Sequence, residues 1–208
     1  MKTLAEEKNI LLSTDSELTT EEKALFAYFG EGAKIKPPIR ILNPHRIKIG
    51  DRVSILEYCS INAFQDLTYL RRFIDDAYKP AFPEEDYLYD SAIEIGNESQ
   101  GGRFLFMSCT SHIALEENVL VSERVFIGDN NHTFSHPQVP IMQQPNQKGE
   151  PVRIGKGSWI GVGAAILKGT RIGAFSVVGA NSVCSGNFPD RSVIGPEQAK
   201  LLFTMDKQ

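Results

Sequence analysis

The segment from Ile154 to Cys184, IGKGSWIGVGAAILKGTRIGAFSVVGANSVC, repeats one pattern every six residues. An apolar or thiol side chain opens each repeat, and a small side chain follows four places after each of the first five. The opening positions are Ile154, Ile160, Ile166, Ile172, Val178 and Cys184, and the small ones are Ser158, Ala164, Thr170, Ser176 and Ser182. An α-helix repeats near 3.6 residues and a single strand alternates every two, so neither explains this period.

A period of six is typical of a parallel β-helix. Three repeats form one triangular coil of about 18 residues, with a short strand on each side and a turn at each corner. The large side chain then points into the prism, and the small one lies near a corner, where bulk would clash. Glycines such as Gly155 and Gly161 suit the tight path of the backbone. We therefore predict an all-β chain whose coils pair with one another at strand spacing.

The same rhythm extends toward the N-terminus with two interruptions. It begins near residue 41 and returns at 93–96 and again at 115–127. The interruptions are long for loops within a repeat, so they are candidates for lining a site. We predict an N-terminal helical segment at 1–40, a β-helix at 41–196 with insertions at 62–91 and 130–151, and a tail at 197–208.

Two segments outside the repeat predict short helices. Thr19, with Glu22 three places later, forms a capping-box pattern before a helix that ends at a glycine. Phe26 and Phe29 lie on one face of that helix, which we expect to pack against the main body. Within the first insertion, residues 67–80 also have an amphipathic pattern, and we expect a capping turn or short helix at the C-terminal end.

Composition narrows the class of protein. The chain has 208 residues, 41% of them hydrophobic and 23% charged, which is ordinary for a soluble globular domain. A formal net charge of −4 argues against general nucleic-acid binding. No apolar run approaches the roughly 20 residues that span a bilayer, and the N-terminus lacks the apolar core of a secretory signal. Three widely spaced cysteines without a CxxC pair indicate buried free thiols in a reducing compartment, so we expect a cytoplasmic protein.

Two further segments, VFIGDNNHTFSHP and GEPVRIGKGSWIGVGAAILKGTRIG, together with the six-residue repeat, resemble the hexapeptide-repeat acyltransferases. In the galactoside- and maltose-type sugar acetyltransferases a coil likewise ends in a histidine that opens a long loop, and a segment containing tryptophan re-enters the prism. The resemblance covers roughly residues 41–196. It implies a left-handed prism, acetyl-CoA as the acyl donor, a sugar or sugar nucleotide as the acceptor, no metal, and a homotrimer with each site between two prisms.

The resemblance makes His132 the candidate general base. A sugar hydroxyl or amine must lose its proton as it attacks the thioester carbonyl of acetyl-CoA, and an imidazole is a competent base near neutral pH. Transfer is then direct, without an acyl-enzyme. Asp129, three residues earlier, either orients the ring or the acceptor, or forms an Asx turn. His136 is expected to be a solvated loop residue, and His45 and His112 to be structural or surface residues.

Residues 151–188 contain no Asp or Glu, yet they contain Arg153, Lys156, Lys168 and Arg171. A locally positive surface favours the phosphates of CoA, although scattered solvated charges are the alternative. By resemblance, the residues along the cofactor are Trp159, Val162, Gly163, Ala180 and Ser185, with Lys168 and Arg171 toward the phosphates. Gly186 stands where relatives often have a lysine, which removes one phosphate partner. Tyrosines of the first insertion, Tyr69, Tyr78, Tyr87 and Tyr89, are candidates to stack on the acceptor.

Two other functions remain open on the sequence. The γ-type carbonic anhydrases use the same prism with three zinc-binding histidines, for which His112, His132 and His136 are candidates. That family places its ligands on regular coils, whereas His136 lies in a loop beside a proline. The second alternative is a non-catalytic prism that serves as a scaffold or sugar-binding subunit. Stoichiometric metal would indicate the first, and failure to bind acetyl-CoA would indicate the second.

Overall fold

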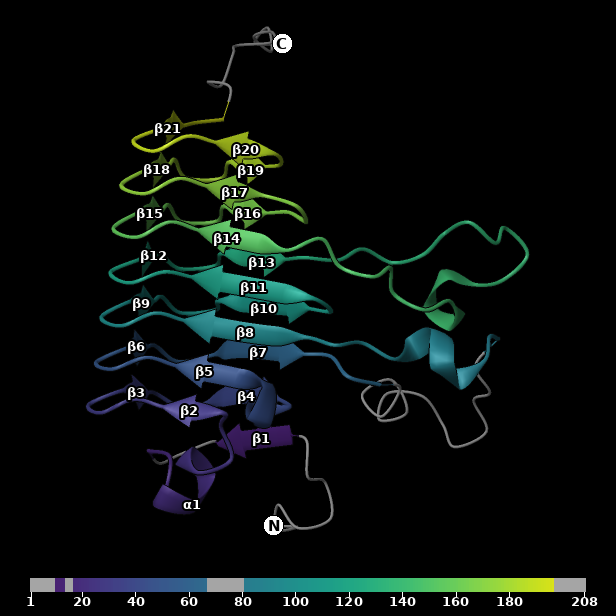
Figure 1. Ribbon diagram of the computed structural model, residues 1–208, viewed down its shortest axis with the longest axis horizontal. Helices are drawn as coiled ribbons and strands as arrows, with labels where there is room; N and C mark the ends of the chain where they lie inside the picture. Colours follow the sequence, from purple (N-terminus) through teal and green to yellow (C-terminus); the bar gives the residue numbers. More distant parts are fainter. Residues whose placement is uncertain (1–9, 14–16, 67–80, 197–208) are drawn as a thin grey trace, which may run out of the picture.

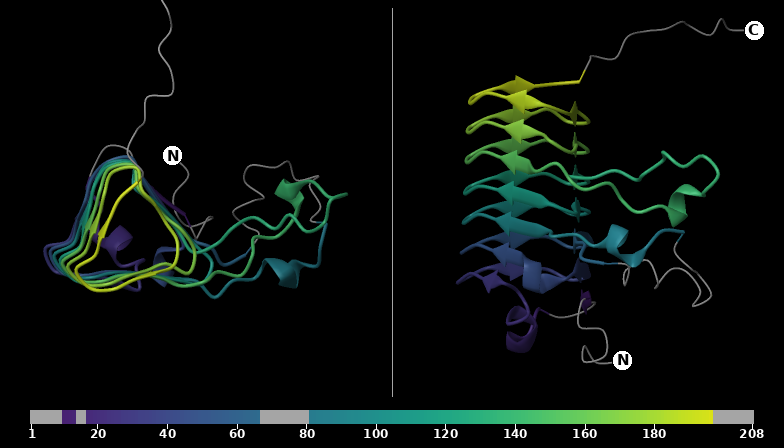
Figure 2. Two further views of the ribbon diagram at one scale, coloured as in Figure 1. Left: turned by 90° about the horizontal axis from the view of Figure 1, so that it is seen from above. Right: turned by 45° about the vertical axis from the view of Figure 1, so that its right-hand side comes forward.

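The computed structural model describes residues 10–13, 17–66 and 81–196. The chain winds into stacked coils (Figure 1), and the view along the stack shows a triangular outline (Figure 2). Within these ranges, every pairing between strands is parallel except that of the first strand, which runs antiparallel to its neighbour. The prediction of a parallel β-helix is confirmed.

Three seven-stranded sheets, here called A, B and C, form the sides of the prism. Sheet A contains β1 (Ile10–Ser13), β4 (Ile39–Leu42), β7 (Cys59–Ala63), β10 (Phe106–Cys109), β13 (Phe126–Gly128), β16 (Ala165–Ile166) and β19 (Val183–Cys184). Sheet B contains β2 (Tyr28–Phe29), β5 (Ile47–Ile49), β8 (Ala92–Ile95), β11 (His112–Leu115), β14 (Val152–Ile154), β17 (Arg171–Ile172) and β20 (Asn187–Phe188). Sheet C contains β3 (Lys34–Ile35), β6 (Ser54–Ile55), β9 (Gln100–Gly101), β12 (Leu120–Val121), β15 (Trp159–Ile160), β18 (Val177–Val178) and β21 (Val193–Ile194).

The described helices are short and lie outside the sheets. They are α1 (Thr20–Lys23) and the 3-10 turns η1 (Pro44–Arg46), η3 (Glu84–Tyr87) and η4 (Ile141–Gln143). Within the described parts of the chain, none is long and apolar enough to cross a membrane.

The core is the column of side chains that opens the repeats. Ile154, Ile160, Ile166, Val178 and Cys184 are all fully buried. Their alignment follows from the pairing: Ile166 of β16 lies opposite Cys184 of β19, 18 positions further along the chain. Each inward side chain therefore packs on its counterparts in the coils above and below, and burial of a large aliphatic side chain contributes about 1.5–3 kcal/mol.

The small residues at the corners do more than avoid a clash. The Ser158 hydroxyl donates to the Gly173 carbonyl oxygen at 3.0 Å and accepts the Ser176 amide at 3.0 Å. Thr170 donates to the Cys184 carbonyl oxygen at 3.0 Å. These short hydroxyls satisfy backbone groups at the turns, where the strand ladder is interrupted and water is excluded.

The parallel coils begin earlier than the sequence pattern indicated. The predicted capping box is present, because the Thr19 hydroxyl accepts the Glu22 amide and Glu22 accepts the Thr19 amide. The helix that follows ends at Lys23, and β2 already pairs with β5. Residue 41 is therefore too late a start for the prism. The signal was present, since Phe29, Ile35 and residue 41 are six apart.

Two excursions leave the prism from the corner between sheets A and B (Figure 2). The first connects β7 to β8 and the second connects β13 to β14. They extend from the same edge because each connects a strand of sheet A to the next strand of sheet B. The connection between them in the stack, from β10 to β11, is a short turn. The helix expected at 67–80, with Tyr69 and Tyr78, and the tail at 197–208 lie outside the described residues.

All three cysteines are buried and free, as predicted. Burial raises the pKa of the Cys59 thiol to about 11, and its S–H donates to the Leu56 and Gly102 carbonyl oxygens. Cys184 occupies an inward position of the repeat. These thiols are packing residues of the core.

Close approach between coils predicts a large effect of one methyl group. A Cβ at Gly155 would lie 2.5 Å from the Ala174 backbone nitrogen of the next coil, whereas a Cβ at Gly195 would meet nothing within 4 Å. Gly155→Ala should therefore destabilise the protein by about 1–3 kcal/mol, lowering Tm by roughly 2–4 °C for each kcal/mol. Calorimetric melts of the two variants check this, with Gly195→Ala as the matched control. Equal Tm values would contradict it.

Candidate active site

His132 lies at the base of the second excursion, just outside the prism. The strand β13 ends at Gly128, and the two limbs of the loop then pair with each other. His132 forms an antiparallel bridge with Asn146, and the Gln147 amide donates to the Asn131 carbonyl oxygen at 2.8 Å. The paired limbs hold the His132 backbone at the edge of sheet A.

A pocket of about 400 Å³ opens beside His132. It lies between the outer face of sheet A and the two excursions, so its walls come from segments far apart in the sequence. The lining residues are Phe64, Asp66, Tyr87, Tyr89, Phe106, Ser108, Phe126, Asn130, Asn131, His132 and Asn146. Its size and its aromatic walls with a few polar groups are typical of small-molecule sites.

An aromatic platform forms the floor of this pocket on sheet A. The rings of Phe106 and Phe126, on neighbouring strands, stack with centroids 5.9 Å apart and planes 14° apart. The Phe126 ring lies over Gly128, where an added Cβ would be 2.5 Å from the ring. Outward positions of a β-helix are solvent-facing, so two stacked phenylalanines there provide an apolar surface for a ligand.

The His132 ring is exposed, and within the described residues it makes no hydrogen bond or ion pair. The neighbouring Asn130 side chain, in contrast, is held by hydrogen bonds within the protein. The Asn130 side-chain amide donates to the Ser108 carbonyl oxygen at 2.9 Å and to the Asp129 carboxylate at 3.0 Å. The ring nitrogens of His132 are therefore available to a molecule in the pocket.

Asp129 does not orient the histidine. Its carboxylate is fully buried and accepts the backbone amides of Thr110 and Ser111, both at 2.8 Å. The Cys109 thiol donates to the same carboxylate at 3.2 Å. Burial, reinforced by this negative charge, raises the pKa of the Cys109 thiol, so it remains a donor at neutral pH. The predicted catalytic role of Asp129 is replaced by a structural one: it holds the turn of the preceding coil beneath the pocket.

The other histidines lie apart from the pocket. The His136 ring packs on Phe82 of the first excursion with centroids 4.8 Å apart, so it is not merely solvated. His45 hydrogen-bonds Gln65 at 3.2 Å, and His112 lies on sheet B, 3.8 Å from the Glu94 carboxylate. Across the described ranges, no three His, Cys, Asp or Glu side chains are placed to hold a metal ion. The proposed zinc ligands His112, His132 and His136 are therefore not assembled there.

The predicted cofactor residues are divided between two corners of the prism. Val162, Gly163 and Ala180 lie between sheets C and A, next to Trp159 of β15. Lys168 and Ser185 lie between sheets A and B, and Arg171 is on the outer face of sheet B. A single chain does not bring these residues onto one surface. Trp159 also donates its indole N–H to the Ser122 hydroxyl at 2.9 Å.

The acid-free tract is largely neutralised by acidic residues from preceding segments of the chain. Lys168 pairs with the Glu150 carboxylate at 2.7 Å, Arg153 pairs with Glu116, and Lys156 lies 3.9 Å from Glu117. Among the residues described, Arg171 is the one base of the tract without an acidic partner. Acidic partners therefore offset the positive charge of Arg153, Lys156 and Lys168, which weakens the expectation of a positive surface there.

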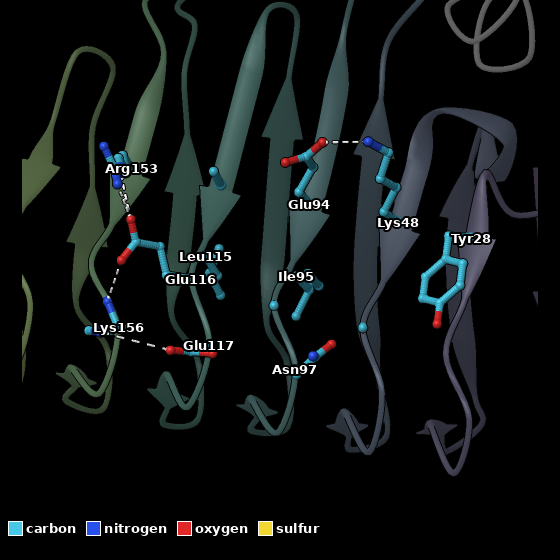
Figure 3. Close-up of a pocket in the computed structure, with 13 residues that line it drawn as sticks. Tyr28, Lys48, Glu94, Ile95, Asn97, Leu115, Glu116, Glu117, Arg153 and Lys156 are labelled. Atoms are coloured by element: carbon cyan, nitrogen blue, oxygen red, sulfur yellow. Dashed lines mark hydrogen bonds and ion pairs between the residues drawn. The ribbon is translucent and has the colours of Figure 1, made fainter.

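A wider groove of about 620 Å³ crosses the outer face of sheet B (Figure 3). It runs from Tyr28 past Glu94 to Arg153, and its lining includes Gly50, Gly96 and the small side chain of Ala114. Its charges are engaged with one another, as in the 2.8 Å pair of Lys48 with Glu94 that Figure 3 draws. We assign the candidate site to the His132 pocket, because it combines an exposed imidazole with an aromatic enclosure.

Sequence reasoning singled out His132 and missed most of the residues that line the pocket beside it. Phe106, Phe126, Asn130 and Asn146 were not predicted. The available signal was the presence of phenylalanine at outward positions of the repeat. Tyr87 and Tyr89 were expected to stack on a ligand, and both line the pocket, but their hydroxyls bind the backbone of the other excursion.

No family model matches the chain. It is 32% identical to a probable acetyltransferase of Mycobacterium tuberculosis over 114 residues, which cover 55% of this chain and 38% of that protein. It is 33% identical to a putative lipopolysaccharide biosynthesis O-acetyl transferase of Escherichia coli over 106 residues, covering 48% of this chain and 54% of that one. The similarity therefore spans about half of each relative or less.

The fold is also found among solved structures. An N-acyltransferase from Bacillus cereus, in complex with dTDP and 3-hydroxybutyryl-CoA, matches with a TM-score of 0.63 at 20% identity, covering 85% of this chain and 83% of that one. At this identity the likeness shows the fold alone, which is the left-handed parallel β-helix that the resemblance implied.

The contacts of Asp129 predict its importance for stability. An amide in its place has one acceptor oxygen for two backbone N–H groups and turns its own N–H groups toward donors. Asp129→Asn should therefore lower the free energy of unfolding by about 1–3 kcal/mol. Asp90→Asn is the control, because its fully exposed carboxylate pairs only with Arg46 at the surface. Urea unfolding midpoints measure both, and a midpoint for Asp129→Asn equal to that of the control would refute the anchoring role.

Proposed function

Because this chain is related in sequence and in fold to the hexapeptide-repeat acyltransferases, we propose that it transfers an acetyl group from acetyl-CoA to a hydroxyl or amine of a sugar or sugar nucleotide. The single observation that carries the proposal is the exposed His132 imidazole in the wall of an aromatic-lined pocket of about 400 Å³. Neither the donor nor the acceptor requires a metal in this reaction.

His132 acts as the general base in the proposed mechanism. The acceptor O–H or N–H proton moves to a ring nitrogen of His132 as the acceptor oxygen or nitrogen bonds to the thioester carbonyl carbon. The carbon–sulfur bond then breaks, and the CoA sulfur leaves with the proton returned from the imidazolium. The ring is suited to this role because no described protein group occupies its nitrogens.

The acceptor binds against the platform of Phe106 and Phe126. A sugar ring has apolar C–H faces and polar edges, and it fits a pocket with an aromatic floor and carboxamide rims. Asn131 and Asn146 line the pocket beside His132 and supply those rims. The acceptor hydroxyl or amine that points toward His132 is the one that becomes acylated.

The donor approaches along the outer face of sheet A. Phe126 of β13 lies opposite Ala165 of β16, which lies opposite Val183 of β19, so this column leads from the pocket toward the late coils. The small side chain of Ala165 lets a thin pantetheine arm lie close to the backbone. Lys168 and Ser185 flank the same face at the corner with sheet B.

A homotrimer completes this arrangement. Val162, Gly163 and Ala180 lie on the opposite corner of the prism, so they reach the cofactor from a neighbouring copy. Exposed apolar side chains follow that corner and its flanks, which supports association there; they include Trp159 at 48%, Val162 at 42% and Val183 at 69% relative exposure.

Replacing the proposed base tests the mechanism. His132→Gln removes the base without adding charge, so turnover should fall about 10²–10⁴-fold. Thiol release from acetyl-CoA is measured with a panel of methyl glycosides, amino sugars and nucleotide sugars. His112→Gln, on sheet B, is the matched control and should retain wild-type turnover. A fully active His132→Gln enzyme would overturn the proposed role.

Filling the donor path tests the placement of acetyl-CoA. Ala165 and Ala114 both face outward from strands, the first on sheet A and the second on sheet B. Ala165→Trp should raise the Kd for acetyl-CoA at least tenfold in calorimetry, because the indole occupies the space of the pantetheine arm. Ala114→Trp should leave the affinity unchanged. If wild-type protein binds no acetyl-CoA at all, the scaffold interpretation replaces the enzyme.

A further inference from the structure

Two tyrosines join the excursions that flank the pocket. Tyr87 and Tyr89 belong to the first excursion, at and just after η3. The buried Tyr87 donates its hydroxyl hydrogen to the Gln143 carbonyl oxygen at 2.7 Å. The Tyr89 hydroxyl accepts the Asn146 amide at 2.9 Å and donates to the Asn146 carbonyl oxygen at 3.3 Å. Both contacts reach the returning limb of the second excursion, more than 50 residues later in the chain.

The contact made by Tyr89 continues directly to the histidine. Asn146 is the bridge partner of His132, and the next residue, Gln147, donates its amide to Asn131 at 2.8 Å. A short path therefore runs from the Tyr89 hydroxyl through the Asn146 peptide to the His132 backbone. The His132 ring itself has no described partner, so its place over the pocket depends on how its backbone is held.

The other end of the path is anchored to the prism. The Tyr89 amide donates to the Gln65 carbonyl oxygen at 3.0 Å, shortly after β7 ends. Its side chain packs against two buried residues, Leu42 at the end of β4 and Phe64 just after β7. Tyr89 thus connects the edge of the coil stack to the returning limb of the second excursion. Burial raises the pKa of Tyr89 to about 12, so the hydroxyl remains protonated and keeps its donor function at neutral pH.

We propose that Tyr89 is a positioning residue, which sets the location of the His132 imidazole by holding the Asn146 backbone. The inference rests on the proposed function, in which His132 is the base. The physical reason is that proton transfer requires the ring nitrogen within hydrogen-bond reach of the acceptor, and a displacement of about 1 Å can cost up to 10²-fold in rate. The ring of Tyr89 lines the pocket, while its hydroxyl acts on the loop and not on the substrate.

Removal of one oxygen atom tests the proposal. Tyr89→Phe keeps the ring and loses the hydroxyl, so kcat should fall about tenfold while KM for acetyl-CoA stays unchanged. Tyr28→Phe is the matched control, because the Tyr28 hydroxyl also donates to a protein acceptor, the Asp51 carboxylate at 2.8 Å. Tyr28 lies in β2 on sheet B and does not line the His132 pocket. The acceptor is whichever compound of the glycoside and nucleotide-sugar panel wild-type enzyme acetylates fastest.

A double-variant cycle separates positioning from other effects. If Tyr89 acts through His132, then Tyr89→Phe lowers the residual rate of the His132→Gln enzyme by less than twofold. A full tenfold loss in that background would overturn the proposal. If His132→Gln alone is fully active, the proposed function has failed instead, so the two failures are distinguishable.

A spectroscopic readout tests the same inference without turnover. The carbon-bound ring protons of His132 are assigned by NMR through their loss in His132→Gln. Tyr89→Phe should shift these resonances and accelerate hydrogen exchange of the Gln147 amide, whereas Tyr28→Phe should change neither. Unchanged His132 resonances in a folded Tyr89→Phe protein would refute the proposal.

Discussion

The described strands of this protein pair with the strands directly above and below them in the stack, and the rest of the structure depends on that constraint. A two-residue strand such as β16 has partners in β13 and β19, and the three lie side by side in the stack. Each coil therefore needs an inward side chain that packs on its counterparts and a corner that lets the backbone turn tightly. The six-residue repeat supplies both, and the corner hydroxyls of Ser158 and Thr170 also satisfy the backbone where the ladder is interrupted.

This constraint also decides where functional segments can be inserted. A long segment within a strand would break the ladders on both sides, whereas an insertion at a corner leaves them intact. Both excursions leave from the corner between sheets A and B, two coils apart in the stack. They consequently lie side by side and enclose a pocket above the outer face of sheet A. Asp129 stabilises this corner by accepting two backbone amides of the preceding coil.

Charge patterns along a coiled chain have to be interpreted across coils. The tract from 151 to 188 has bases and no acids, which suggested a positive surface. Stacking places Glu116 beside Arg153, 37 residues away in sequence, and the two charges are paired. The same effect accounts for the division of the predicted cofactor residues between two corners, because residues that are close in sequence turn onto different faces of the prism.

The six-residue spacing of apolar and small side chains was sufficient to predict the parallel β-helix, since inward packing and tight corners are local requirements that each repeat must meet. It was also sufficient to locate His132 at the mouth of a loop and Cys184 in the core. Only the tertiary structure decided that Asp129 is an anchor, that Phe106 and Phe126 form a platform, and that Tyr89 reaches Asn146. These contacts join segments separated by one or more coils, and their partners depend on how the corners stack, which no local pattern encodes.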